Sequence, residues 1–348
     1  MFIKRKVKIK QMRVLLGMSG GLDSTYAAIK LKEKGYEVEG ALLIMHDYAD
    51  VESAKESADA VGIPLRIIDC KKRFCEKVID NFADEYLKGR TPNPCVVCND
   101  YVKFAVLYET AKREGFDRIA TGHYAGIVKK GDRYAVLRGK DEKKDQSYML
   151  WRLKQEILSV LELPLYDYYK SDIKEKSREI NLAAADRDES QEICFIPDND
   201  YASYIEKNYK SSPFGDFVDI NGNVLGKHKG ILHYTVGQRK GLGIALGERA
   251  FVSSIDCESN RIVLSRQSDI GDTEFELSDV VFSGLENKTE GGMDLLVKVR
   301  YLAPPVKARV TFKSDGAQVE LFEKRVVTPG QSAVFYDGDA VMLGGFIK

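Results

Sequence analysis

The feature that most constrains the fold is a regular alternation of short apolar runs and helical segments over the first 125 residues. Strands are expected at residues 8–17, 38–45, 65–69 and 118–121. Helices are expected at residues 24–34, 52–61, 74–87 and 102–114. Strand and helix in alternation predict a parallel sheet covered on both faces, and such sheets bind ligands at the carboxyl ends of their strands.

The rest of the chain has a different pattern. A hairpin over Tyr124 to Val128 and Arg133 to Arg138 follows the alternating region, and two helical segments at residues 147–161 and 174–182 come next. Beyond about residue 205 glycines become frequent, strands are short, and no amphipathic helix is evident. We therefore expect an α/β protein with a parallel, doubly wound domain over residues 1–205, a small central domain over residues 206–270 and a C-terminal all-β barrel over residues 271–348.

Composition excludes several other classes. The 348 residues include 53 Lys or Arg and 53 Asp or Glu, which excludes a chain that is basic throughout. The longest apolar runs, such as Ala41 to Met45, are far shorter than the roughly 20 residues that a membrane span needs. No apolar signal segment follows the basic N-terminus, so we expect a cytoplasmic protein without a membrane partner. Six Cys are too few for a disulfide-stapled scaffold, which favours catalytic, redox or metal-binding thiols.

A Gly-rich loop, GMSGGLDST at residues 17–25, stands where the first strand passes to the first helix. Glycines let a backbone turn tightly and approach a ligand, and a helix N-terminus offers unpaired N–H groups to a phosphate. Asp23 is placed to hold Mg²⁺ beside such a phosphate. A Walker A loop is excluded because no Gly-Lys-Ser/Thr follows, and the dinucleotide glycine spacing is absent too. By itself the loop leaves an ordinary Gly-rich turn open.

The second candidate region is the segment TPNPCVVCN at residues 91–99, which carries Cys95 and Cys98. Because proline does not fit inside a helix, Pro92 and Pro94 predict a rigid loop here. A third thiol, Cys194, lies much further along the chain, and the remaining three cysteines are expected to be packing residues. Structural zinc is disfavoured because no second pair of ligands completes a four-ligand site, and the fold of a thioredoxin-type dithiol is absent.

Eight sequence blocks carry a resemblance to a known family. SGGLDS at residues 19–24 resembles the PP-loop of the ATP pyrophosphatase superfamily, whose members cleave ATP to AMP and pyrophosphate. With the other blocks, the chain resembles the tRNA-specific 2-thiouridylases from residue 17 to residue 336. The blocks are GMSGGLDS, TPNPCVVCN with the following Lys103-Phe104, ATGHYA (120–125), KDQSYML (144–150), ICFIP (193–197), YTVGQRKGLG (234–243), VRY (299–301) and TPGQSAVFY (328–336).

The resemblance implies ATP-dependent transfer of sulfur to C2 of the wobble uridine in tRNAs for Lys, Glu and Gln. ATP is implied to adenylate the C2 oxygen, after which sulfur displaces AMP. By the family's pattern Cys194 carries a persulfide, supplied by a cysteine desulfurase or a sulfur carrier protein, and Cys98 is the nucleophile that later forms a disulfide with it. The implied ATP-binding residues are Gly17, Met18, Ser19, Gly20, Gly21, Leu22, Asp23, Ser24, Leu43 and Gly122.

Cys95 departs from the family's pattern. Many members have an Asp at this place, which helps to address the target base, and a Cys does not simply inherit that role. Cys95, Cys98 and Cys194 instead form a set of three thiols, and three Cys are able to hold a [4Fe-4S] cluster with one iron left open for sulfide. The persulfide relay and the cluster mechanism use the same residues, so both stay open.

The resemblance also implies tRNA contacts from all parts of the chain. The implied residues are Asn93, Pro94, Cys95, His123, Lys144, Asp145, Gln146, Arg300, Tyr301 and Gln331. The structural alternatives are a satisfied core histidine, a solvated charge run and a buried strand tyrosine. Residues 225–249, with five Lys or Arg and one acid, add a basic surface to a central tRNA-binding domain.

Two other functions remain as alternatives. A PP-loop enzyme that adenylates a small molecule would have no use for Cys98 and Cys194. A non-catalytic RNA-binding or metal-binding protein would have no use for Asp23 and Ser24.

Overall fold

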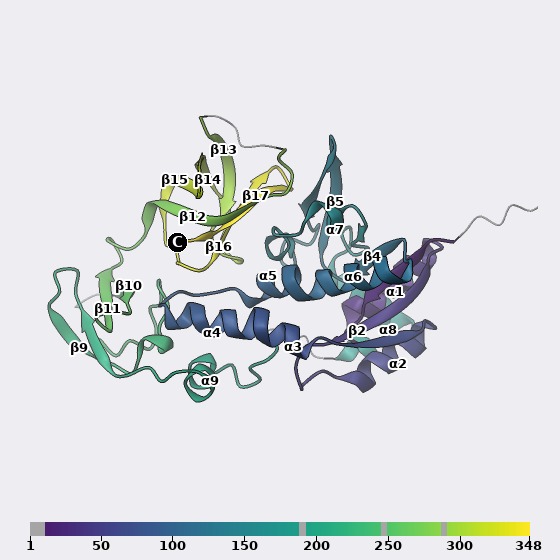
Figure 1. Cartoon of the computed structure of the whole chain (residues 1–348), viewed down its shortest axis with the longest axis horizontal. Coiled ribbons are helices and arrows are strands. Elements are labelled where there is room, and N and C mark those ends of the chain that lie inside the picture. The colour runs from purple at the N-terminus through teal and green to yellow at the C-terminus, as the bar shows by residue number, and fades with distance from the viewer. Residues whose placement is uncertain (1–10, 188–192, 245–248, 287–290) are drawn as a thin grey trace, which may run out of the picture.

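A computed structural model describes residues 11–187, 193–244, 249–286 and 291–348. Its N-terminal part is a five-stranded parallel sheet in the order β3-β2-β1-β4-β7 (Figure 1). The strands are β1 (Arg13–Gly17), β2 (Glu37–Ile44), β3 (Leu65–Asp69), β4 (Arg118–Thr121) and β7 (Leu161–Glu162). The four expected strands are confirmed, although residues 8–10 of the first lie outside the described residues.

Helices cover both faces of this sheet. Successive residues of a strand point to opposite sides, so the apolar residues of each strand pack against helices on both faces. On β1, Val14 and Leu16 pack in one core with α1 (Leu22–Glu33), α2 (Val51–Val61) and α8 (Lys170–Glu179). Leu15, between them, packs in the other core with α4 (Asp80–Leu87) and α6 (Phe104–Glu114). The predicted doubly wound α/β domain is confirmed.

Two long helical segments each contain one turn of π-helix. The first runs from α3 (Lys71–Phe74) through η1 (Cys75–Ile79) into α4, and the second from α5 (Pro94–Cys98) through η2 (Asn99–Lys103) into α6. The two segments lie side by side across the middle of the molecule (Figure 1). π-turns often mark functional sites, and the second one directly follows the two cysteines of the C-x-x-C motif.

The helix expected over residues 147–161 is wrong. The structure has two short helices there, η3 (Ser147–Met149) and α7 (Gln155–Leu158), and then strand β7. Leu150, Trp151 and Leu153 are all buried, so packing of these apolar side chains holds the stretch in place. The Trp151 indole donates to Ser332 Oγ (3.0 Å) of the C-terminal barrel, and this packing overrides helical periodicity.

The central domain is a four-stranded sheet in the order β10-β11-β8-β9. Its strands are β8 (Gly215–Val218), β9 (Val224–His228), β10 (Ala250–Asp256) and β11 (Arg261–Arg266). Two short helices precede it in sequence, η4 (Ala183–Asp186) and α9 (Tyr201–Asn208), and a third, η5 (Ile231–His233), lies between β9 and β10. A separate small domain is confirmed, and its expected boundaries at residues 206 and 270 stay a prediction.

The C-terminal domain is a closed antiparallel barrel, as expected. Its strands follow the order β12-β15-β14-β13-β16-β17, and β12 also pairs with β17 to close it. They are β12 (Asp272–Phe282), β13 (Met293–Lys298), β14 (Val306–Lys313), β15 (Gly316–Arg325), β16 (Ser332–Asp337) and β17 (Ala340–Ile347). Closure removes the free edges that an open sheet would expose.

The hairpin of the N-terminal domain belongs to the same sheet as the barrel. It consists of β5 (Ala125–Lys130) and β6 (Arg133–Arg138), and β6 pairs with β17 through Leu137 and Ala340. A second contact joins the barrel to the segment before α5, where the Thr91 N–H donates to the Pro329 carbonyl (2.8 Å). The barrel is therefore fixed against the N-terminal domain at two places, the hairpin and the segment that leads into the cysteine-bearing helix.

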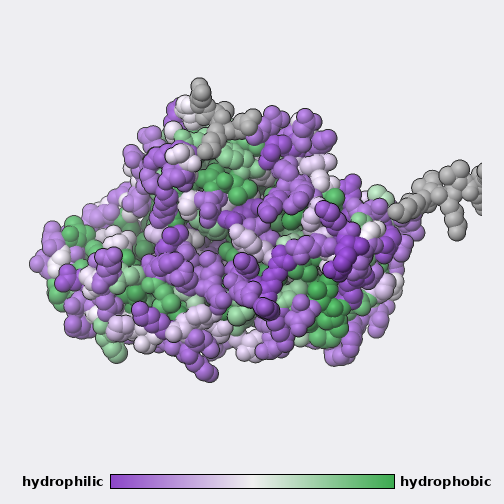
Figure 2. Space-filling model, in the orientation of Figure 1, coloured by the Kyte–Doolittle hydropathy of each residue, from purple (hydrophilic) through white to green (hydrophobic). Residues whose placement is uncertain are grey.

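The face seen in Figure 1 is mostly hydrophilic, and its hydrophobic residues gather in separate patches (Figure 2). Among the described residues, no helix combines the length and the apolar character that a membrane crossing requires.

Candidate active site

The Gly-rich loop joins β1 to α1 at the carboxyl edge of the parallel sheet, and two glycines explain its position. Gly20 has φ +84°, and a Cβ on it would lie 2.6 Å from the backbone nitrogen of Ala54. A Cβ on Gly122, just after β4, would lie 2.7 Å from the carbonyl carbon of Asp23. Only glycine permits these approaches, which press the loop between α2 and the end of β4.

Hydrogen bonds fix the loop further. The Gly20 carbonyl accepts from the Ser57 hydroxyl (2.9 Å) and from the Arg187 guanidinium (2.5 Å). Ser24 Oγ accepts from the Ser19 N–H (3.2 Å) and donates to the Gly21 carbonyl (3.0 Å). Arg187 was not anticipated from the sequence, because no motif surrounds it.

The side chains of the loop divide into two groups. Met18, Leu22 and Thr25 are buried, so they stabilise the helix start and can offer a ligand only backbone groups. Ser19 is exposed and Asp23 is partly exposed. The Thr25 hydroxyl is used inside the loop, because its Oγ1 donates to the Gly21 carbonyl (2.9 Å).

Asp23 has two close partners that the sequence did not indicate. Its Oδ1 accepts from the Lys170 ammonium (2.6 Å) and from the Tyr124 hydroxyl (2.6 Å). Lys170 is the first residue of α8, where no motif draws attention to it. Tyr124 stands in the ATGHYA block, next to His123, and this block was the available signal.

A cavity opens in front of the loop. It brings together the loop residues Gly17, Met18, Ser19, Asp23 and Ser24 with Ala41, Leu42, Leu43, Met45, Lys103, Thr121, Gly122, His123 and Gln146. Leu43 and Gly122, expected at the ATP site, thus share a cavity with His123 and Gln146, expected at the tRNA site. Of the described residues that line it, Asp23 alone carries a carboxylate, so Asp23 is the residue that would hold Mg²⁺.

The cysteine segment is a helix, and the predicted rigid loop is wrong. Pro94 is the first residue of α5, a position that tolerates proline because the missing N–H would have no helical partner. The Asn93 carboxamide oxygen caps the helix by accepting from the Cys95 N–H (3.1 Å). Cys95 and Cys98 stand three positions apart in this helix, so they share one face.

The three thiols differ in exposure. Cys98 is buried, whereas Cys95 and Cys194 keep part of their surface exposed although protein atoms surround both thiols closely enough to desolvate them. The Cys98 thiol contacts Met45 Sδ at 3.6 Å, and Met45 lines the cavity, so one side chain separates Cys98 from it. Among the described residues no group of three or more His, Cys, Asp or Glu is arranged to hold a metal ion, so the three thiols do not form a ready cluster site.

Burial dominates the acidity of these thiols. It raises the pKa of Cys98 to about 12 and that of Cys194 to about 11, and it also raises the pKa of Cys95. The Lys103 ammonium opposes all three shifts, and the Lys103 N–H further favours the Cys98 thiolate through a hydrogen bond. Lys103 is the last residue of the π-helical turn η2 and lines the cavity. It follows the TPNPCVVCN block, but no site role was expected for it.

His123 is buried at the end of β4. Its Nδ1 is hydrogen-bonded to Thr121 Oγ1 (2.7 Å), and its ring lies 5.5 Å from that of Phe104. Burial holds its pKa well below 6.5, with a smaller contribution from the Lys103 charge. The imidazole is therefore neutral at pH 7 and acts as a hydrogen-bonding group, not as a cation.

Of the other expected tRNA residues, three lie at contacts between domains and three lie within the N-terminal domain: Arg300, Tyr301 and Gln331 belong to the first group, and Lys144, Asp145 and Gln146 to the second. Asp145 is buried, and Gln146 accepts from the Tyr124 N–H (3.0 Å) through its side chain. The Arg300 guanidinium donates to the Val236 carbonyl (2.7 Å), and the Gln331 side chain donates to the Thr91 carbonyl (2.7 Å). Tyr301 lies beside Tyr148, with ring centroids 6.0 Å apart. Lys144 is partly exposed, in the loop before η3.

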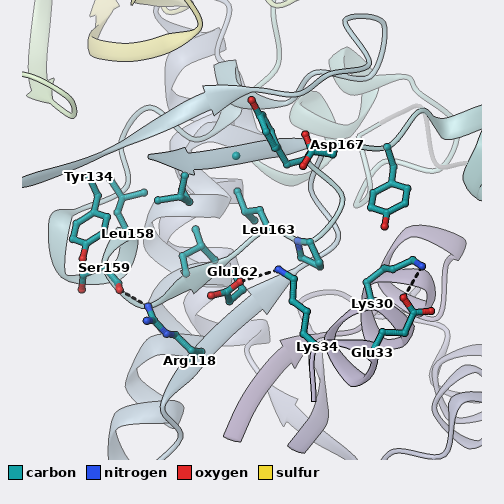
Figure 3. A pocket seen from close by; sticks show the side chains of 16 residues that line it. Lys30, Glu33, Lys34, Arg118, Tyr134, Leu158, Ser159, Glu162, Leu163 and Asp167 are labelled. Carbon is teal, nitrogen blue, oxygen red and sulfur yellow. Dashed lines mark hydrogen bonds and ion pairs between the residues drawn. The ribbon is translucent and has the colours of Figure 1, made fainter. Parts of the chain in front are cut away.

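A second cavity lies away from the loop and the thiols, beside the C-terminal end of α1 and strand β7 (Figure 3). Its charged groups neutralise one another: Lys34 pairs with Glu162 (3.5 Å) and Lys30 with Glu33 (2.7 Å). Arg118 donates to the Ser159 carbonyl (2.6 Å). The cavity at the Gly-rich loop is therefore the better candidate for chemistry.

The sequence matches known protein families over nearly the whole chain. Three family models match successive parts of it: the tRNA methyl transferase HUP domain (residues 12–198), the tRNA methyl transferase PRC-barrel domain (202–266) and the aminomethyltransferase β-barrel domain (272–347). A Clostridium acetobutylicum protein named tRNA-specific 2-thiouridylase MnmA is 44% identical over 354 residues, which cover 97% of this chain and 99% of the relative.

Two further relatives bear the same family name. The tRNA-specific 2-thiouridylase MnmA 1 of Clostridium botulinum (strain Okra) is 44% identical over 346 residues, covering 96% of this chain and 98% of the relative. MnmA 2 of Clostridium tetani is 44% identical over 359 residues, covering 98% and 100%. Two of the domain models are named for methyl transfer, but the relatives that match the full length are named for thiolation. The chain belongs to the tRNA-specific 2-thiouridylase family.

Proposed function

We propose that this protein is an ATP-dependent tRNA-uridine 2-sulfurtransferase that acts on the wobble uridine of tRNAs for Lys, Glu and Gln. The observation that carries the proposal is the position of Met45, which lines the cavity at the Gly-rich loop and contacts the Cys98 thiol at 3.6 Å. A nucleotide site and a nucleophile therefore lie on two sides of one residue. An enzyme that only adenylates a small molecule would not need this arrangement.

The first step is adenylation. The C2 oxygen of uridine attacks the α-phosphorus of ATP, pyrophosphate leaves, and the N3 proton is lost as the C2–O–AMP bond forms. The backbone N–H groups of the Gly-rich loop and the start of α1 would bind the phosphates. Mg²⁺, held by Asp23, would neutralise phosphate charge. Lys170 contacts the Asp23 carboxylate at 2.6 Å and would keep it oriented toward the cavity.

The second step is sulfur transfer. The terminal sulfur of a persulfide on Cys194 attacks C2, and AMP leaves with the C2 oxygen. The Cys98 thiolate then attacks Cys194 Sγ, which releases 2-thiouridine and forms a Cys98–Cys194 disulfide. A dithiol reductant must return two electrons and two protons to this disulfide before the next cycle. The cysteine desulfurase or sulfur carrier protein would reload Cys194, whose side chain is exposed.

Lys103 would favour the reactive thiolate form of the three cysteines. Only a thiolate is nucleophilic, and burial raises the pKa of Cys98 to about 12. The Lys103 charge opposes that shift at all three thiols. Cys95, in place of the family's usual Asp, would add a third thiol to the face of α5 that carries Cys98.

A [4Fe-4S] cluster on Cys95, Cys98 and Cys194 is the alternative route for the sulfur. Among the described residues the three thiols are not arranged as a metal site. Purification without oxygen, with iron and sulfide analysis, separates the two schemes. A colourless protein that is fully active without iron supports the relay, whereas activity that depends on iron overturns it.

Reconstitution tests the function itself. Protein, ATP, Mg²⁺, a persulfide donor, a dithiol reductant and unmodified tRNA are incubated, and 2-thiouridine is detected by retardation in a mercury gel. We expect product with the wild-type protein and none with Cys98→Ser or Cys194→Ser, whereas Cys75→Ser, at an exposed cysteine outside the site, serves as the matched control. Thiolation at full rate in either site variant would refute the relay, and no thiolation with any donor would favour a small-molecule substrate.

A further inference from the structure

Arg187 binds the Gly-rich loop but is not among the described residues that line the cavity in front of it. It directly follows η4, which packs in one core with α1. Its Nη1 atom donates to two backbone carbonyls, those of Gly20 (2.5 Å) and Ser53 (3.0 Å). Its Nη2 atom pairs with the Glu56 carboxylate (2.7 Å). The guanidinium therefore ties the loop to the first turns of α2.

The Gly20 carbonyl has a second donor. The Ser57 hydroxyl, buried on α2, donates to it at 2.9 Å. Arg187 Nη1 also lies 3.1 Å from Ser57 Oγ, so the serine oxygen accepts from the guanidinium while its own proton is given to Gly20. A hydrogen bond from a charged donor is about twice as strong as one between neutral groups. Of the two donors, Arg187 should therefore hold the carbonyl more firmly.

The direction of this carbonyl decides the direction of the next N–H. In a planar trans peptide the C=O and N–H groups point to opposite sides. Because the Gly20 carbonyl faces Arg187 and Ser57, the Gly21 N–H points away from them. It contacts Ser19 Oγ at 3.4 Å, and Ser19 lines the cavity. The Gly21 N–H thus lies on the side of the loop where a phosphate would bind.

The two residues that flank this peptide are of the type that resists rotation least. Gly20 has φ +84° and is followed by a second glycine, and glycine adopts positive and negative φ about equally readily. Rotation of the peptide by half a turn would point the Gly20 carbonyl oxygen into the phosphate site, where it would repel an anion. Hydrogen bonds are therefore needed to hold the productive orientation, and Arg187 and Ser57 supply them.

We propose that Arg187 is a positioning residue for ATP: with Ser57, it holds the Gly20–Gly21 peptide so that the Gly21 N–H faces the phosphates. Arg187 acts through the Gly20 carbonyl and not by contact with the reacting atoms. The proposal rests on the proposed function, since the ligand is its ATP. A ligand binds only those molecules whose peptide is correctly oriented, so its apparent affinity falls in proportion to their fraction.

ATP binding in the presence of Mg²⁺, measured by calorimetry without tRNA, tests this role. Arg187→Gln should weaken ATP binding about tenfold, as expected if the productive orientation falls to about a tenth of the molecules. Ser57→Ala, which removes the neutral donor, should weaken it about threefold. Arg187→Lys keeps a cation at the carbonyl and should stay within about threefold of the wild type. Affinity for an unmodified tRNA transcript should be the same in all of these proteins.

Steady-state thiolation separates positioning from a merely structural role. Saturating ATP selects the correct peptide orientation, so Arg187→Gln should raise KM for ATP about tenfold and keep kcat near the wild-type value. A purely structural role would lower thermal stability and the amount of active protein, which reduces kcat and leaves KM for ATP unchanged.

Arg178→Gln is the matched control. Arg178 lies beside η4 and forms an ion pair at 2.9 Å with Asp186, the last residue of η4. Among the described residues its guanidinium hydrogen-bonds to Asp186 and to none of the Gly-rich loop. Its loss should leave ATP affinity, KM and kcat unchanged. If Arg187→Gln fails to fold, Ser57→Ala carries the test, because alanine is well tolerated inside a helix.

The outcomes distinguish this proposal from the proposed function. Wild-type ATP affinity and KM in a folded Arg187→Gln variant would overturn the positioning role, and so would a loss of kcat at unchanged KM. If the wild-type protein thiolates tRNA in that case, the proposed function stands. A wild-type protein that binds ATP, with the expected losses in the variants, but thiolates no tRNA would instead refute the proposed function alone.

Discussion

The candidate site has two parts that are built from the chain in different ways. One is the Gly-rich loop, called the nucleotide side after its proposed ligand, and the other is the three cysteines, called the thiol side. The nucleotide side comes largely from residues 17–24, which are adjacent in sequence, with Gly122 brought against them. The thiol side combines Cys95 and Cys98 of α5 with Cys194, which stands about a hundred residues further along the chain. A local motif reveals the first side, whereas the second exists only when these distant segments have folded together.

This difference predicts that single changes act most strongly on the nucleotide side, where the backbone itself is closely packed. Gly122→Ala places a Cβ 2.7 Å from the Asp23 carbonyl carbon and 2.9 Å from the Ser24 nitrogen. Because backbone atoms must move, we expect the thiolation rate to fall about 100-fold, as for a misplacement of about 1 Å at an active site. The measurement is the tRNA thiolation rate at saturating tRNA.

Gly115→Ala is the control for that variant. Gly115 ends α6 with φ +72°, and nothing lies within 4 Å of a Cβ placed there. The strain should cost roughly 1 kcal/mol of stability without changing the thiolation rate. Equal rates for the two variants would contradict the close-packing account.

Lys103 lines the cavity and also acts on the three thiols. Its loss should change the reactivity of the thiols without a large loss of stability. Lys103→Met removes the charge that favours all three thiolates. If their pKa values rise by about one unit, the thiolation rate at a fixed pH below those values falls about tenfold, and the pH–rate profile moves to higher pH. Lys103→Arg should restore the profile, and an unchanged profile in the methionine variant would exclude this role.

Within the thiol side, Cys194 should be more reactive than Cys98. Burial raises the pKa of Cys194 to about 11 and that of Cys98 to about 12. At a pH below both values, a thiol whose pKa is lower by one unit has about ten times more thiolate. Cys194 should therefore react about tenfold faster than Cys98 with iodoacetamide at the same pH. Mass spectrometry of the alkylated peptides measures both rates, and faster labelling of Cys98 would contradict the burial that we describe.

The smallest effect is expected where the barrel docks on the segment before α5. Gln331→Ala removes the hydrogen bond from the Gln331 side chain to the Thr91 carbonyl. The free energy of unfolding should fall by about 1 kcal/mol, as measured by chemical denaturation. A decrease in tRNA affinity without any decrease in stability would instead show that Gln331 acts mainly on the RNA.

The sequence indicated most of the parallel sheet because each of its strands is a local apolar run next to a helix. It failed at residues 147–161, where Trp151 is buried against the barrel, and at Pro94, where a proline opens a helix. Arg187 and Lys170 were missed because each acts through contacts with residues distant in sequence, and such contacts leave no periodic or spaced signal. Lys103 follows the TPNPCVVCN block, but its effect on the thiols depends on the folded positions of Cys95 and Cys194.

By itself the sequence determined the doubly wound domain, the Gly-rich loop, the barrel class and the family, because these depend on periodicity, local turn chemistry and motifs in order. The tertiary structure decided which residues share the cavity. It placed Met45 between the nucleotide side and Cys98, gave Asp23 its partner Lys170, and brought Arg187 against the Gly20 carbonyl. Burial and charge act through space, so pKa values and the partners of a backbone carbonyl follow from packing that no single stretch of sequence contains.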